Sequence, residues 1–178
     1  MTPPEAEAAL ETFTVLCDTR EQDTARSRRR FRAMGAPVLR ATLDFGDYAA
    51  TVTLPGGRPL LDLSSRVRPL CVIERKMDLD ELAMCLTRGR DRFRREMERA
   101  RDAGATVWLL VENGNWEAVL AGRYRSRFQP KAYLGSLVAW SVRYGMRVVF
   151  CDELTAPILI REILYRDLKE RLTNGEYG

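Results

Sequence analysis

Residues 71–82, "CVIERKMDLDEL", join an apolar segment to a dense cluster of charges. The run Cys71–Ile73 predicts a buried strand, and the charged triplet Glu74–Lys76 follows it without a break. Asp78 is a typical helix N-cap residue, and Glu81 at the third helical position predicts a capping box. Charges at the end of a buried strand need partners or a function, because burying an unpaired charge is costly.

The rest of the chain predicts one α/β domain over residues 13–178, preceded by a loose leader at residues 1–12. Strands are expected at 12–18, 37–54 (two strands around a turn at 44–46), 69–76, 105–112 and 146–152. Helices are expected at 21–34, 79–103 with a break at Gly89, 115–121, 130–144 and 154–172. The last two strands are continuously apolar, which is typical of strands buried on both faces. We therefore expect a central mixed sheet with helices on both faces.

Composition excludes several classes of protein. The 178 residues contain no histidine, which excludes Ser-His-Asp hydrolases, zincins and nucleases that bind metal through histidine. The four cysteines, Cys17, Cys71, Cys85 and Cys151, form no C-x-x-C pair, and we interpret them as free thiols in a reduced cytoplasm. No apolar run approaches the roughly 20 residues of a membrane helix, and the acidic N-terminus lacks the basic region of a secretory signal. We therefore expect an intracellular protein without membrane contact.

Arginine is clustered in two segments of a chain whose net charge is +4. The first cluster lies within residues 26–32 and the second within residues 88–101. Four arginines of the second cluster recur at helical spacing and form one stripe: Arg88, Arg92, Arg95 and Arg99. Such a stripe is suited to binding DNA phosphates. The alternative is a solvated helix face that Glu96 and Glu98 partly neutralise.

Acidic residues lie at or near the ends of three predicted strands, where open α/β sheets bind ligands. These acids are Asp18, Asp47 and Glu74. Magnesium is satisfied by one or two carboxylates together with a phosphate and water. Lys76 shares a strand face with Glu74, so it is placed to orient or deprotonate a water, or to stabilise developing negative charge. These residues predict metal-assisted phosphodiester hydrolysis without histidine.

A plainer structural interpretation stands beside this one. Glu74 and Lys76 lie two residues apart on a strand and are suited to a simple salt bridge. Asp18 also suits a turn or cap, and Asp44 is a rival for the role of metal ligand. Glu112 ends another predicted strand without a motif around it, and we interpret it as a surface acid.

Two motifs give the chain a resemblance to a known family. The sequence "GDY" at 46–48, followed by "VIERKMDLDEL" at 72–82, matches the signature G-D-x(n)-E-R-K-x-x-x-D. That signature belongs to the nuclease domain of the XPF-type structure-specific DNA endonucleases. "VLCDTRE" at 15–21 resembles the opening strand of that family, and "DRF" at 91–93 resembles the helix after the signature. The resemblance covers residues 13–151, nearly the whole chain.

The resemblance implies a restriction-endonuclease-like α/β fold and Mg2+- or Mn2+-dependent cleavage of branched DNA such as flaps and forks. The site residues that it implies are Asp18, Arg20, Asp47, Glu74, Arg75, Lys76 and Asp80. Asp47 and Glu74 would bind the metal, with the Arg75 carbonyl as a candidate third ligand. Lys76 would activate the water, and Asp80 would be the final motif acid. Asp18 and Arg20 would flank the metal and the scissile phosphate.

The chain also departs from the family pattern. Family members usually carry a tandem helix-hairpin-helix module after the nuclease domain, and no Gly-x-Gly hairpin follows it here. That departure weakens the expectation of branched-DNA preference and suits a phage or mobile-element enzyme. The family's nuclease domains dimerise, and the apolar segment 130–145 is suited either to a homodimer contact or to the core. A non-catalytic DNA-binding scaffold and a restriction-like junction resolvase are the alternatives. The expected partners are DNA and a second copy of the chain, without a nucleotide cofactor.

Overall fold

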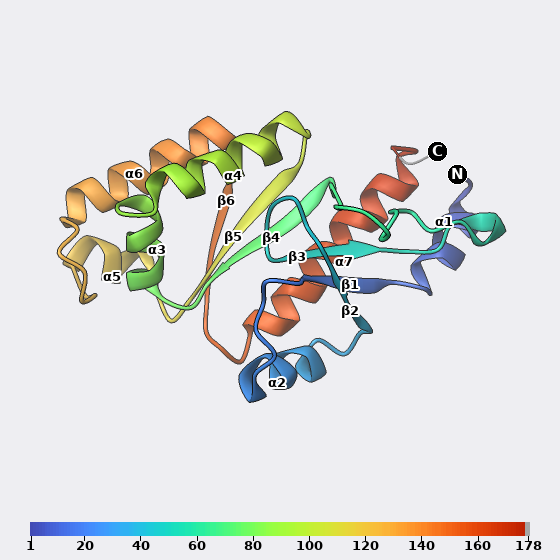
Figure 1. The fold of residues 1–178 in the computed structure, drawn as a ribbon, viewed down its shortest axis with the longest axis horizontal. Helices are drawn as coiled ribbons and strands as arrows, with labels where there is room; N and C mark the ends of the chain where they lie inside the picture. Colours follow the sequence, from blue (N-terminus) through green and yellow to red (C-terminus); the bar gives the residue numbers. More distant parts are fainter. Residues whose placement is uncertain (177–178) are drawn as a thin grey trace.

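A six-stranded mixed sheet forms the centre of the molecule, as seen in a computed structural model that describes residues 1–176 (Figure 1). The strands are β1 (Thr14–Asp18), β2 (Val38–Ala41), β3 (Tyr48–Thr51), β4 (Cys71–Lys76), β5 (Thr106–Glu112) and β6 (Arg147–Cys151). Their order across the sheet is β2-β1-β3-β4-β5-β6. β4, β5 and β6 run parallel, as do β1 and β2, whereas β3 runs antiparallel to both of its neighbours. The mixed sheet expected from the sequence is confirmed.

Helices cover both faces of this sheet, as the sequence predicted (Figure 1). One face carries α3 (Leu79–Leu86), α4 (Arg90–Asp102), α5 (Trp116–Ala121) and α6 (Pro130–Tyr144). The other face carries α1 (Pro3–Leu10), α2 (Ala25–Ala33) and α7 (Ala156–Thr173), and the short 3-10 turn η1 (Pro55–Gly57) follows β3. Each group of helices encloses its own hydrophobic cluster against the sheet.

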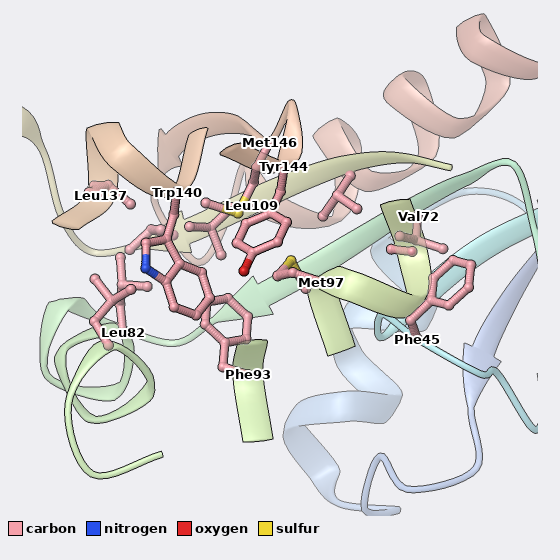
Figure 2. Packing of buried hydrophobic residues seen from close by; sticks show 14 of the residues in the cluster. Phe45, Val72, Leu82, Phe93, Met97, Leu109, Leu137, Trp140, Tyr144 and Met146 are labelled. Atoms are coloured by element: carbon pink, nitrogen blue, oxygen red, sulfur yellow. The ribbon is translucent and has the colours of Figure 1, made fainter. Parts of the chain in front are cut away.

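Large aromatic side chains pack among aliphatic ones in the cluster on the α4 and α6 face (Figure 2). Phe93 of α4 stacks on Trp140 of α6 with ring centroids 4.9 Å apart. At the other end of the cluster, Phe45 from the loop before β3 lies near Val72 of β4 (Figure 2). Phe45 is completely buried. Burial of so large an apolar ring anchors its loop to the sheet.

Local chemistry explains most of the element boundaries. α3 and α4 are separate helices because the chain breaks at Gly89, which confirms the expected position of the break. Asp78 caps α3, since its carboxylate accepts a hydrogen bond from the N–H of Glu81 at 2.8 Å. The expected capping box forms only in part, because the Glu81 carboxylate accepts from the N–H of Met77. β6 was expected to be buried on both faces, but it is half-buried because it lies at the sheet edge.

The N-terminal segment is a helix, so the prediction of a loose leader at residues 1–12 was wrong. The N–H of Thr2 donates to the Glu5 carboxylate at 2.7 Å in a capping box, and prolines occupy the first helical positions. The buried side chains of α1 are Ala6, Ala9 and Leu10. They pack in the same cluster as α7, so tertiary contact orders the segment. Within the described chain, no helix has the length and apolar character needed to span a bilayer.

Candidate active site

Three adjacent strands place Asp18, Asp47 and Glu74 side by side. The N–H of Asp18 donates to the carbonyl of Asp47 at 2.9 Å, and the N–H of Asp47 donates to the carbonyl of Ile73 at 2.8 Å. β3 runs antiparallel between β1 and β4, so the start of β3 lies beside the ends of its two neighbours. Acids that are far apart in the sequence therefore meet where the ends of β1 and β4 lie beside the start of β3.

The position of Asp47 is set by backbone contacts on either side. Its Oδ2 accepts a hydrogen bond from the N–H of Arg75 at 2.8 Å. The preceding residue, Gly46, has a φ of +75°, and a Cβ there would lie 2.7 Å from the Cβ of Val72. Glycine is required at this position because the backbone is left-handed and the neighbouring strand is too close for a side chain.

Glu74 and Lys76 point to the same face of β4, and both are buried. The Lys76 ammonium donates a hydrogen bond to Oε1 of Glu74 and lies 5.4 Å from the centre of the Phe93 ring. Oε2 of Glu74 is also buried, and it has no hydrogen-bond partner among the described residues. The salt bridge of the plainer interpretation is present, but it satisfies only one oxygen of the carboxylate. A buried acceptor without a partner is uncommon in folded proteins.

Burial is the largest influence on the pKa values of Asp47, Glu74 and Lys76. Burial and the negative charge of Glu74 together raise the pKa of Asp47 to about 7. Burial also raises the pKa of Glu74, although the Lys76 ammonium opposes this shift. Burial alone would lower the pKa of Lys76, but the carboxylates of Glu74 and Asp47 outweigh it and raise that pKa. Two carboxylates thus share a desolvated site in which additional positive charge is stabilising.

The donor set suits a hard divalent cation such as Mg2+. The unpartnered Oε2 of Glu74 and the carboxylate of Asp47 are the oxygen donors that such a cation prefers. Within residues 1–176, no group of three or more His, Cys, Asp or Glu side chains is placed to hold a metal ion. A cation here would therefore rely on two carboxylates, the backbone and water. Magnesium is commonly bound with so few protein ligands.

Arg75 points away from Glu74, as strand alternation predicted, and its side chain is structural. Its Nε and Nη2 donate to the two carboxylate oxygens of Glu112 at 2.6 and 2.7 Å. Arg26 approaches the same carboxylate at 3.6 Å. Glu112 is completely buried, so its interpretation as a surface acid was wrong. Glu112 is buried because Arg75 lies on the neighbouring strand β4 and neutralises it, and the residues around Glu112 in the sequence do not indicate this partner.

Asp18 orients Arg20 beside the acids. Oδ1 of Asp18 accepts from the backbone N–H and the Nε of Arg20 at 2.8 and 2.6 Å, and Oδ2 accepts from the N–H of Leu43 at 2.9 Å. The hydrogen bond that Arg20 donates to the Asp18 carboxylate raises the pKa of Arg20. The Arg20 side chain remains half-exposed. Both Asp18 oxygens are engaged, which fits a positioning role better than a metal ligand.

Glu96 belongs to the site, whereas the sequence placed it only in the alternative interpretation of the arginine stripe, as a charge that partly neutralises a solvated helix face. It is buried, and its Oε1 accepts a hydrogen bond from the N–H of Gly46 at 3.1 Å. Its carboxylate also lies 3.8 Å from Nη2 of Arg20. The available signal was its spacing, because Glu96 lies three residues after the buried Phe93 on α4.

Asp80 is engaged elsewhere. Its Oδ1 accepts from the N–H of Ser126 at 2.6 Å, and its Oδ2 accepts from Nε of Arg125 at 3.1 Å. Burial works against its charged form, but these hydrogen bonds outweigh that effect and lower the pKa of Asp80. The structure thus places this motif acid against the loop between α5 and α6, where it lines a groove of about 980 Å3 with Arg88 and Arg125.

The two arginine clusters have different roles. In the first, Arg29 and Arg30 pair with Glu153 and Glu21. In the second, Arg88 lies in the turn before Gly89, so the predicted four-residue stripe is interrupted. Three of its members do share α4: Arg92, Arg95 and Arg99. The guanidinium groups of the first two are exposed and make no ion pair within residues 1–176.

The cysteines have no place in this chemistry. All four are free, which confirms their interpretation as unpaired thiols. Burial raises the pKa of Cys17 and of Cys151 to about 12. Thiols with so high a pKa are poor nucleophiles near neutral pH.

Comparisons with known proteins agree with this geometry. A model of the ERCC4 domain family matches residues 17–158. XPF from Aeropyrum pernix superimposes with a TM-score of 0.60 and 22% identity over 86% of this chain and 61% of that chain. XPF from Aeropyrum pernix in complex with DNA gives a TM-score of 0.59 and 23% identity over 88% and 65%. The chain thus spans less than two thirds of these structures, and the likeness confirms the restriction-endonuclease-like fold. No curated protein matches the sequence.

Proposed function

The chain belongs to the ERCC4 domain family, and we propose that it is a metal-dependent endonuclease that hydrolyses phosphodiester bonds in DNA. The observation that carries this proposal is the buried carboxylate of Glu74. One of its oxygens pairs with Lys76, the other has no partner among the described residues, and a second acid, Asp47, lies beside it. A structural ion pair gains nothing from a second buried acid and an unpaired oxygen, because both are costly without a cation.

The residues would divide the chemistry as follows. Asp47 and Glu74 would hold the metal, with the Arg75 carbonyl as a candidate third ligand. Bound Mg2+ or Mn2+ would neutralise phosphate charge and acidify a water. Lys76 holds a positive charge beside Glu74 and would orient that water or offset charge developing on the phosphate. Arg20, fixed by Asp18, would contact the scissile phosphate as a charge-assisted donor.

DNA is the substrate that the surroundings of the site favour. The exposed side chains of Arg92 and Arg95 lie on the helix that also contributes Glu96 to the site. Phosphate contacts of this kind provide affinity without reading sequence. The similarity to XPF from Aeropyrum pernix in complex with DNA supports the same substrate class. We further propose a preference for branched DNA such as flaps or forks, which rests on family membership.

A homodimer is the proposed assembly, and α6 is its proposed contact. Tyr133, Leu137 and Trp140 of this helix belong to the core, whereas Val138 and Val142 are 48% and 81% exposed. Side chains four residues apart lie on the same face of a helix, so the two valines form one small exposed apolar patch. Light scattering at micromolar concentration tests this proposal, and a monomer there would remove it.

Cleavage of end-labelled DNA tests the function. The substrates are duplex, single strand, 3′ flap, fork and four-way junction, each with Mg2+, Mn2+ or EDTA. The control is Glu74→Gln, which keeps the size of the side chain and removes its charge. We expect metal-dependent products from the wild type and none from the variant.

Each other outcome points to a different protein. Equal cutting by wild type and variant would reject the assigned site. DNA binding without any cutting would favour a non-catalytic scaffold of the same fold. Products from four-way junctions alone would favour a junction resolvase.

A further inference from the structure

Three arginines converge on one buried carboxylate three residues before Asp47. Asp44 is only 4% exposed. Its Oδ2 lies 3.0 Å from Nε of Arg68, and its Oδ1 lies 3.4 Å from Nη1 of Arg66 and 3.5 Å from Nε of Arg99. Arg99 also donates to the Asp44 carbonyl from Nε and Nη2, at 3.2 and 3.0 Å. Asp44, the rival for the role of metal ligand, is thus the anchor of an arginine cluster.

The cluster carries more positive charge than the acid needs. Three guanidinium groups surround one carboxylate, so two positive charges are left without an opposite charge in this set. The side chains of Arg66, Arg68 and Arg99 are 64%, 71% and 41% exposed, so the cluster is accessible from solvent. Arg99 also donates from Nη1 to the carbonyl of Arg95 at 3.2 Å, so Arg66 and Arg68 hold most of the donors that are left for a ligand. Each guanidinium has five donors in a fixed fork, and Asp44 uses only some of them. The acid holds the arginines in place without neutralising them.

The cluster is also placed next to the candidate active site. Asp47 is the third residue after Asp44, which limits the distance between their Cα atoms to about 11 Å. Glu96 of α4 binds the N–H of Gly46, and Arg99, one turn later on α4, binds the carbonyl of Asp44. One helix therefore fixes both ends of the loop that joins the cluster to the metal-binding acid.

We propose that Arg66, Arg68 and Arg99 form a subsite for a backbone phosphate of the bound DNA, one to three nucleotides from the cleaved bond. This inference rests on the proposed DNA substrate. The duplex rises roughly 3.4 Å along its axis per nucleotide of one strand, so a separation of up to about 11 Å along that axis covers at most about three nucleotides. Arg66 and Arg68 lie in the loop before β4, outside both arginine clusters of the sequence. They extend the basic surface from α4 across the loop that carries Asp44.

The test measures the salt dependence of duplex DNA binding by fluorescence anisotropy in EDTA, where cleavage does not interfere. The variant is Arg66→Gln/Arg68→Gln, whose amides retain hydrogen-bond donors for Asp44. The matched control is Arg58→Gln/Arg166→Gln, which removes one charge just after η1 and one from α7, away from the α4 face. Arg66→Lys/Arg68→Lys tests rescue by charge, and circular dichroism verifies that every variant is folded.

Loss of one phosphate contact lowers the magnitude of the slope of log K against log salt by about 0.9. If wild type and variant have equal DNA-binding constants at 1 M salt, this change in slope corresponds to roughly eightfold weaker binding of the variant at 0.1 M salt. We expect it in the glutamine variant, not in the control, with recovery in the lysine variant. A slope equal to that of the control would overturn the subsite while leaving the nuclease proposal intact. Absence of DNA binding by the wild type would overturn both.

A second arm distinguishes the backbone phosphate from free phosphate. Titration of the wild type with inorganic phosphate is followed by calorimetry at constant ionic strength. We expect no binding at millimolar phosphate, because one anion without the rest of the DNA lacks the other contacts. Tight phosphate binding that disappears in the glutamine variant, together with an unchanged DNA slope, would assign the cluster to a free anion and overturn the inference.

Discussion

Substitution of Gly46 by alanine tests whether the loop before β3 is held as tightly as the structure indicates. Two costs add at this position. The φ of +75° is left-handed, which costs an alanine about 1–2 kcal/mol. The new Cβ would also lie 2.7 Å from the Cβ of Val72, and overpacking of this kind costs about 1–3 kcal/mol. We therefore expect Gly46→Ala to lose about 2–5 kcal/mol of unfolding free energy.

Gly35 provides the matched control. Its φ is +62°, and a Cβ there would meet no atom within 4 Å. Gly35→Ala should therefore lose only the conformational cost of about 1–2 kcal/mol. In a domain of this size, 1 kcal/mol shifts the thermal midpoint by about 2–4 °C. Thermal unfolding followed by circular dichroism should thus place Gly46→Ala clearly below Gly35→Ala. Equal midpoints for the two variants would refute the close contact between the loop and β4.

Four further predictions address the remaining parts of the site. Lys76→Ala should keep DNA affinity in anisotropy measurements and lose cleavage, because the lysine acts on the water or the phosphate. A cleavage rate of this variant equal to that of the wild type would contradict the assigned role. Glu112→Gln should lose about 3–5 kcal/mol in denaturant unfolding, because it breaks the buried pair with Arg75; a loss below about 1 kcal/mol would contradict that pairing. Glu96→Ala should slow cleavage with little change in DNA affinity, whereas Glu96→Gln, which keeps an acceptor for Gly46, should restore the rate; equal rates for both would reject a positioning role. Cys17 should resist a thiol reagent at about pH 8 until the protein unfolds, since burial raises its pKa to about 12; rapid labelling of the folded protein would contradict its burial.

Local patterns predicted the elements and the fold class well. Gly89 separates two helices, and Asp78 caps the first of them, as the sequence indicated. Such features depend on hydrogen bonds and backbone preferences within a few residues, so they can be read from the chain directly. The motif around Glu74 also led to the family, which the family model confirms, and the structural likeness confirms the fold.

The errors have a common cause in partners that are distant along the chain. α1 is ordered by contact with α7 at the other end of the sequence. Glu112 is buried because Arg75, 37 residues earlier, lies on the neighbouring strand. Asp80, whose role in the site stays a prediction, likewise accepts a hydrogen bond from a loop residue 46 positions later, Ser126. Hydrophobic pattern and local charge do not specify which distant groups become neighbours.

The sequence by itself determined the strands, the helices after residue 12, the G-D and E-R-K motif and the absence of histidine chemistry. Only the tertiary structure decided which acids and arginines act together. It paired Lys76 with one oxygen of Glu74, left the other without a partner among the described residues, and gathered three arginines around Asp44. The physical reason is that burial and charge pairing depend on sheet order and helix packing, which bring together residues from separate segments of the chain.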